Sequence, residues 1–288
     1  MTARIPVVKF FRKRSPNKSG DGSAGKIAVI GAFNTTETDP TLFTTVDKAL
    51  HDFGSDNTFD GCTCIEPLFA NGATSLLAVN ITTWSSATPP VPTKTVTAEN
   101  LAAALAKIKG EDWDLLFVCA PITSAFQTLI DQYLDATWEI QYPAGYCGAL
   151  TGADSANIAL AATAGDHCYG LIPNQAWEVN GTQLTVLQTA AYYCGLLAGM
   201  SVGNTMTMKQ VPEVTGVSPE LSFETGGAGK ALLEAGLLTV KCRDRNTSRY
   251  VVMNSEQPNG LDLYVNRVRD YVVKQLALHD FLGERNRE

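Results

Sequence analysis

The stretch KIAVIGAF, residues 26–33, is a continuous run of apolar and small residues that follows a Gly/Ser-rich segment. A run without polar alternation is typical of a strand buried on both faces, as in a parallel sheet. Two similar runs follow, SLLAVNIT at 75–82 and WDLLFVCAP at 113–121, with helix-like segments between them. This alternation predicts an α/β fold with a mostly parallel sheet flanked by helices on both faces.

The same alternation continues through the middle of the chain. Short helices are expected near 46–53 and 65–70, and Thr97 is a good N-cap for a longer helix with apolar residues at i, i+4 and i+7. Two more strands are expected near 144–149 and 168–172, and two more helices near 154–163 and 184–201.

After residue 211 the pattern changes. A short helix near 228–234 precedes LLTVKCRD and SRYVVMN, which together indicate a β-hairpin. A last amphipathic helix is expected, with an apolar side defined by Leu261, Val265, Val268, Val272 and Leu276. We therefore expect three parts: an extended N-terminal arm at 1–25, an α/β core domain at 26–210, and a C-terminal hairpin-and-helix region at 211–288 that packs on the core.

Charge is distributed unevenly along the chain. The net charge is −7, yet residues 1–20 carry six basic residues and no acidic one, so the rest of the chain is more acidic than the total indicates. A basic segment on an acidic body predicts binding to something acidic. Nucleic acid is one candidate, and the acidic body of another copy of the same protein is the second.

Neither a secretory signal nor a membrane span is expected. The basic first twenty residues lack an apolar region of the required length. Residues 179–208 are uncharged, but their compact apolar part at 190–203 is shorter than the roughly 20 residues that cross a bilayer, which favours a buried helix. Because the chain has seven cysteines and no signal, we expect buried free thiols in a reducing compartment.

A possible metal site lies in the segment HDFGSDNTFDGCTC. Cys62 and Cys64 could bind a metal together with His51, or with Asp56 and Asp60. Zinc sites need a second ligand pair at a suitable spacing, and none follows. We therefore predict no metal here and interpret the segment as a helix start built from small residues.

Candidate catalytic motifs are also incomplete. ETGGAGK at 224–230 lacks two positions of the phosphate-loop pattern, and no G-x-G-x-x-G follows the strand KIAVIGAF. GMSVG at 199–203 has the letters of G-x-S-x-G, but it ends an expected helix, whereas a nucleophile elbow connects a strand to a helix. His167 lies near Cys147 or Cys168, but adjacent side chains on a strand point to opposite faces. We therefore predict no enzyme activity, no catalytic residue and no cofactor. The alternative is a Rossmann-like α/β enzyme with a substrate site at the carboxyl ends of the strands, around Asn34, Ala120-Pro121 and Gly148.

Several phrases, in their order and spacing, resemble contractile tail sheath proteins. They are LFTTVDKALHDFGSD, LFANGATSLLAVNIT, TAAYYCGLLAGMSVGNTMTMKQVPEVTGV, LLEAGLLTVKCRDRNTSRYVVMNSE and LYVNRVRDYVVKQL. Together the resemblance extends from about residue 26 to 275. It implies a subtilisin-like α/β sheath domain without protease activity.

The resemblance also implies a function. Such a protein is a structural subunit that polymerises helically around an inner tube and contracts to drive the tube through a cell envelope. The implied partners are other copies of the chain, the inner tail tube protein, and baseplate and tail terminator proteins, without direct nucleic-acid binding or membrane insertion. The implied location is a virion tail, a tailocin or an injection particle, assembled in the bacterial cytoplasm. Another tail-associated interaction protein remains an alternative.

Two departures from the family pattern stand out. MNSEQPNG follows the hairpin where the family has a different phrase, and the sequence stops at Glu288, after the first helix of what is usually a larger C-terminal region. Either the protein is a compact sheath subunit or the sequence is truncated.

The N-terminal arm is the predicted intersubunit element. RIPVVKFFRK, residues 4–13, has high β-propensity, but Pro6 and the basic residues make it a poor internal strand. We predict that the arm lies extended across a neighbouring subunit, where it could add a strand to an exposed sheet edge. Its contact residues would be Ile5, Val7, Val8, Phe10, Arg12 and Arg14. The alternatives are a disordered basic tail and a nucleic-acid-binding tail.

Overall fold

The structure, a computed structural model, describes residues 25–141, 145–202, 204–244, 249–254 and 256–273. The predicted arm residues, Ile5, Val7, Val8, Phe10, Arg12 and Arg14, lie outside the described residues.

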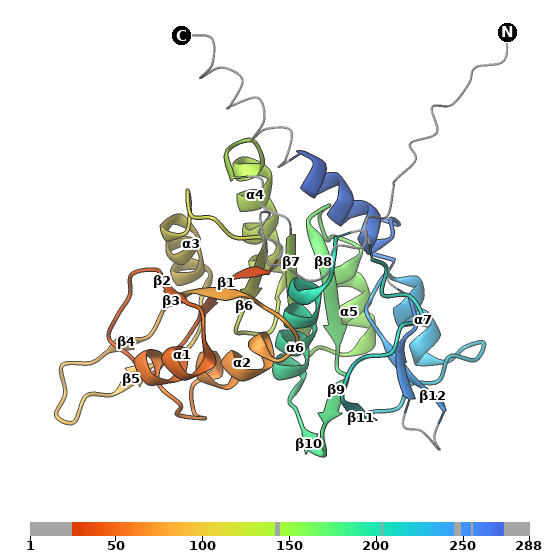
Figure 1. Ribbon diagram of the computed structural model, residues 1–288, viewed down its shortest axis with the longest axis horizontal. Coiled ribbons are helices and arrows are strands. Elements are labelled where there is room, and N and C mark those ends of the chain that lie inside the picture. The colour runs from red at the N-terminus through yellow and green to blue at the C-terminus, as the bar shows by residue number, and fades with distance from the viewer. Residues whose placement is uncertain (1–24, 142–144, 203, 245–248, 255, 274–288) are drawn as a thin grey trace, which may run out of the picture.

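A six-stranded sheet forms the centre of the molecule (Figure 1). The strands follow the order β2-β3-β1-β6-β7-β8. Five are parallel: β1 (Lys26–Gly31), β3 (Ser75–Asn80), β6 (Leu115–Val118), β7 (Gly145–Leu150) and β8 (Cys168–Pro173). The edge strand β2 (Thr41–Phe43) is antiparallel to β3. Four of the parallel strands are buried along their whole length and β1 is buried after Lys26, so the apolar runs form strands covered on both faces.

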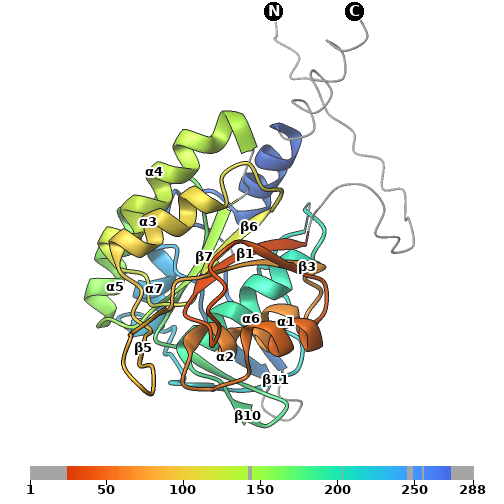
Figure 2. The ribbon, with the colours of Figure 1, turned by 90° about the vertical axis from the view of Figure 1, so that its left-hand side faces the viewer.

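Helices cover both faces of this sheet, which confirms the predicted fold class. One face carries α1 (Val46–Phe53), α2 (Asp60–Phe69) and α6 (Val186–Gly199). The other face carries α3 (Ala98–Lys107), α4 (Ser124–Gln141) and α5 (Asp154–Ala161). Figure 2 shows the two groups on opposite sides of the strands.

Helix α6 is the buried helix expected in the uncharged stretch. Residues 189–198 are all buried, and small residues let the helix approach α2 closely. A Cβ on Gly195 would lie 2.2 Å from the carbonyl oxygen of Leu68, so only glycine fits there. In the part of the chain that the structure describes, no helix is both long and apolar enough to cross a bilayer.

Helix α2 begins earlier than its sequence predicts. The expected helix near 65–70 is only its second half, because the helix starts at Asp60. The amide of Gly61 donates to the carbonyl oxygen of Ala32 at 2.9 Å, and a Cβ at Gly61 would lie 2.5 Å from that oxygen. A contact with the segment after β1 therefore fixes the helix start, and a local pattern cannot reveal such a contact.

The C-terminal part has the expected short helix α7 (Ala228–Glu234) and a hairpin of β12 (Val240–Asp244) and β13 (Arg249–Val252). A second small sheet has the order β10-β9-β11, formed by Thr182–Gln183, Ala176–Val179 and Val214–Ser218. A two-stranded ribbon, β4 (Thr83–Trp84) with β5 (Pro92–Thr93), lies in the Pro-rich loop. The last described element is a helix at 263–273, called the last helix below.

Candidate assembly surface

The residues of the possible metal site do not converge on an ion. Cys62 and Cys64 are buried inside α2, and the Cys62 thiol donates to the carbonyl oxygen of Phe53 at 3.3 Å. The side chain of His51 is largely exposed and contacts Asp52. Among the described residues, no group of three His, Cys, Asp or Glu side chains could hold a metal ion.

The cysteines behave as small core residues. Six of the seven, all except Cys242, are buried. Burial raises the pKa of Cys119 well above its usual range, and burial likewise raises the pKa of Cys168. A thiol that holds its proton is a poor nucleophile, so these positions lack the features of a reactive cysteine.

Of the residues named for a Rossmann-like enzyme site, Pro121 lines a cavity, whereas Asn34, Ala120 and Gly148 do not. A cavity of about 560 Å³ lies at the carboxyl ends of β6 and β7, between the starts of α4 and α5. The side chains that line the cavity are small or medium-sized and uncharged. The side-chain amide of Asn157 donates to the carbonyl oxygen of Gly152 and is therefore not free to bind a ligand. Asn34 is exposed outside this lining, and Ile122 fills the space beside Gly148. The buried His167 lies at the opposite, amino ends of the strands.

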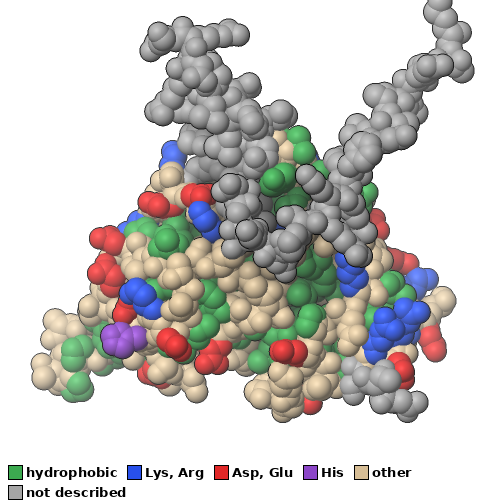
Figure 3. All heavy atoms as spheres, in the orientation of Figure 1, with side chains coloured by type: hydrophobic (Ala, Val, Ile, Leu, Met, Phe, Trp, Pro, Cys, Tyr) green, Lys and Arg blue, Asp and Glu red, His purple; other side chains and the backbone are tan. Residues whose placement is uncertain are grey.

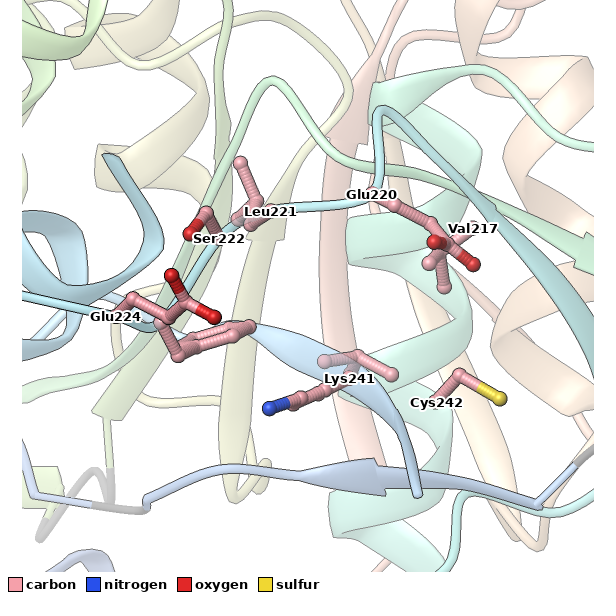
Figure 4. Close-up of a pocket in the computed structure, with 9 residues that line it drawn as sticks. Val217, Glu220, Leu221, Ser222, Glu224, Lys241 and Cys242 are labelled. Atoms are coloured by element: carbon pink, nitrogen blue, oxygen red, sulfur yellow. The ribbon is translucent and has the colours of Figure 1, made fainter. Parts of the chain in front are cut away.

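A second, smaller cavity of about 200 Å³ lies between the loop after β11 and strand β12 (Figure 4). Lys241 and Cys242 line it from β12, and the amine of Lys241 lies 5.5 Å from the centre of the Phe223 ring. Glu224 lines it, but Lys230 of the same glycine-rich segment pairs with Glu234 along α7. The segment ETGGAGK is therefore a turn that leads into a helix. Its lysine and Lys241 do not form a cluster of cations that could bind a phosphate.

The main candidate surface is formed by the last helix, which lies at the amino ends of the parallel strands. In both ribbon views it lies beside the end of α4 (Figures 1 and 2). Its inward face is polar. Arg267, which is 6% exposed, donates to the carbonyl oxygens of Leu197 and Met200 at 3.0 Å each. These carbonyls belong to the end of α6, where carbonyl groups lose their regular intrahelical partners; that of Leu197 also accepts from the amide of Met200 at 3.1 Å.

Asp270 anchors the same face one turn later. Its carboxylate accepts from the hydroxyl of Tyr169, at the start of β8, and from Nε of Arg269 at 2.9 Å. Burial raises the pKa of Asp270, and the hydrogen bonds from Arg269 and Tyr169 oppose that shift. Burial also lowers the pKa of Arg267. Both groups are costly to bury, so their bonds to the core fix the orientation of the helix.

The apolar side of this amphipathic helix faces outward. Of the residues that define it in the sequence, Val265 and Val272 are 37% and 44% exposed, and Leu276 lies outside the described residues. Five of the eight large hydrophobic side chains exposed in the described residues lie here: Leu261, Tyr264, Val265, Tyr271 and Val272. With the half-buried Val268 they form a continuous row at helical spacing, called the outer stripe below. Figure 3 shows hydrophobic side chains at the surface where Figure 1 places this helix.

Carboxylates of α4 and of the segment before β8 lie near the same helix. Asp166 pairs with Arg269 at 3.8 Å, and Asp135 of α4 contacts His167 at 3.4 Å. Asp131, also on α4, accepts from the amide of Gly165 at 3.0 Å. Burial and the neighbouring carboxylates of Asp135 and Asp166 raise the pKa of Asp131 to about 6, although the Gly165 bond acts in the opposite direction.

Asp131→Asn is expected to change how stability depends on pH. A carboxyl whose pKa is raised on folding stabilises the fold below its unfolded pKa of about 4, and this contribution is lost as pH rises through about 6. Because the side chain is partly exposed, we expect roughly 1–2 kcal/mol between pH 4 and 7. Urea unfolding of both proteins across this range measures the effect, and wild type should lose more stability than the variant. Parallel curves would contradict the assignment.

Comparison with solved structures shows that the chain has the fold of contractile tail sheath proteins. The sheath tail protein of Desulfitobacterium hafniense matches with a TM-score of 0.66 and 12% identity, over 93% of this chain and 81% of that chain. The sheath tail protein of Listeria innocua matches with a TM-score of 0.65 and 12% identity, over 92% and 79%.

A third match comes from a contractile particle. The helical sheath of the anti-feeding prophage in its contracted state has a TM-score of 0.62 and 18% identity, over 96% of this chain and 77% of that chain. No family model matches the sequence, and no curated protein sequence matches it. The resemblance seen in the sequence phrases is thus confirmed in the fold.

Proposed function

We propose that this protein is a structural subunit of a contractile tail sheath, which polymerises helically around an inner tube and contracts to drive the tube through a cell envelope. The observation that carries the proposal is the extent of the fold likeness. Matches to sheath proteins extend over more than nine-tenths of this chain and more than three-quarters of theirs. A shared fold alone does not fix a function, but a non-catalytic surface and an exposed apolar helix agree with assembly.

The proposal extends to partners and location. The subunit contacts other copies of itself, the inner tail tube protein, and baseplate and tail terminator proteins. It belongs to a virion tail, a tailocin or an injection particle assembled in the bacterial cytoplasm. One of the structures with the same fold is described as the anti-feeding prophage baseplate, at 17% identity and a TM-score of 0.58. We further propose that the chain has no enzyme activity.

Within the subunit we propose the division at 1–25, 26–210 and 211–288. Strand β11 pairs with β9, and the amide of Leu238 donates to the carbonyl oxygen of Leu171 at 2.9 Å. These bonds support a C-terminal region packed on the core. The arm at 1–25 is proposed to link neighbouring subunits through Ile5, Val7, Val8, Phe10, Arg12 and Arg14.

Electron microscopy of the purified, negatively stained protein tests the sheath proposal directly. We expect rings or tubes whose abundance increases with protein concentration, because a helical polymer forms by repeated head-to-tail contacts. Uniform small particles at every concentration, together with melting that responds to a small ligand, would favour the enzyme alternative.

A further inference from the structure

The outer stripe is an apolar surface that the described residues leave uncovered. Two tyrosines and two valines repeat at seven-residue spacing, as Tyr264 with Val265 and Tyr271 with Val272. Tyrosine is enriched where proteins contact one another, because it combines apolar area with few rotatable bonds. The inner face is fixed by Arg267 and Asp270, so the helix cannot rotate to bury the stripe without breaking those bonds.

The N-terminal arm has the matching chemistry. Residues 4–14 read RIPVVKFFRKR, which places five apolar residues among basic ones in a single short segment. Two exposed carboxylates lie by the same helix: Asp166, 67% exposed, pairs with Arg269 of the helix, and Asp135, 73% exposed, contacts His167. An apolar row near these carboxylates complements an apolar segment with cations beside it.

The arm also leaves the domain next to this helix. It joins β1 at Lys26, whose amide donates to the carboxylate of Asp114 at 3.2 Å. Arg267 of the last helix lies close enough to Asp114 for their charges to interact. Strand β8, which holds Asp270 through Tyr169, lies three strand positions from β1, or about 15 Å at the usual spacing. The eleven residues between Arg14 and Lys26 extend to about 36 Å, which is more than enough.

We propose that in the free subunit residues 4–14 of the chain's own arm lie on the outer stripe. Because the arm is covalently joined to the domain, its effective concentration near the outer stripe is high, so weak contacts are sufficient. An arm bound to its own last helix is not available to a neighbouring subunit, and the contact therefore holds free subunits back from assembly. This goes beyond the proposed sheath function, because it concerns the subunit before any polymer exists.

The test is photo-cross-linking in the full-length protein. Benzoylphenylalanine replaces Phe10, and equal amounts of unlabelled and ¹⁵N-labelled protein are mixed at a concentration where no tubes form. After irradiation, mass spectrometry identifies the cross-linked peptides. We expect cross-links from the arm to residues 261–273 that join peptides of the same isotope, which marks an intramolecular contact.

Matched variants distinguish binding of the arm at the outer stripe from non-specific apolar contacts. Tyr271→Ser with Val272→Ser should reduce the cross-link yield by about fivefold or more, because side chains central to an apolar contact carry most of its energy. Leu42→Ser with Val91→Ser, which alters two even more exposed apolar residues far from the stripe, should leave the yield unchanged. In the protein with the unaltered stripe, raising the salt concentration should lower the cross-link yield, since the flanking charges are exposed.

Three outcomes would overturn the proposal. Cross-links that join different isotopes would place the seat on another copy, cross-links to β2 or β12 would indicate strand addition at a sheet edge, and an unchanged yield in the stripe variant would exclude the stripe. Tube formation is scored separately on the protein without cross-linker. A protein that forms tubes but lacks the cross-link contradicts only this inference, and one with the cross-link but no tubes contradicts only the sheath function.

Discussion

Removal of residues 1–20 is expected to abolish tube formation and to leave a folded subunit. The core of the described structure begins at β1, and the Gly/Ser-rich segment before it separates the arm from the domain. Linking neighbours through an extended arm supplies contacts that persist while rigid bodies rotate, so a subunit without the arm lacks those links. Electron microscopy measures tubes, and thermal unfolding should show a Tm within about 3 °C of the full chain, a change that corresponds to roughly 1 kcal/mol.

Point variants of the arm distinguish the roles of its two residue types. Ile5→Ser, Val7→Ser, Val8→Ser and Phe10→Ser together remove the apolar contacts and keep the charge, whereas Arg12→Gln with Arg14→Gln does the reverse. We expect the serine variant to lose tubes, and the glutamine variant to form them with a stronger dependence on protein concentration. Normal tubes from the shortened protein would show that the arm is not the linker.

Arg267→Ala is expected to lower the free energy of unfolding by about 2–4 kcal/mol. The guanidinium donates to two carbonyl oxygens at the end of α6, Leu197 and Met200, and its loss leaves both without this donor and opens a cavity. The substitution also removes the free-energy cost of burying a charge. The expected loss of stability is therefore smaller than the sum of two hydrogen bonds from a charged group. Urea unfolding at constant pH measures the change.

Two variants serve as controls for this prediction. Arg267→Met keeps most of the volume and removes the charge, so its loss should be smaller than that of alanine. Lys230→Ala removes an exposed cation that pairs with Glu234 along α7, and should cost about 1 kcal/mol or less. If alanine at 267 costs no more than alanine at 230, Arg267 does not anchor the helix.

Among the cysteine and histidine candidates, the sequence interpretation agrees with where the structure places them. Cys62 and Cys64 pack within α2, as a helix start made of small residues suggests. His167 and Cys147 start from neighbouring strands, but His167 precedes β8 at its amino end while Cys147 lies inside β7. The function of the arm residues stays a prediction, because they lie outside the described part of the chain.

The sequence by itself determined the sheet, because a strand that is buried on both faces must be apolar at every position, and KIAVIGAF, SLLAVNIT and WDLLFVCAP satisfy that requirement locally. It also determined that residues 263–273 form a helix with one apolar side. Only the tertiary structure decided which side faces inward. The carbonyls that end α6 lie about seventy residues earlier in the chain, and packing brings them next to Arg267. With this side inward, Arg267 and Asp270 both bond to the core, and losing such a bond to a buried group costs about 1–3 kcal/mol. The apolar side of the last helix is therefore left on the surface.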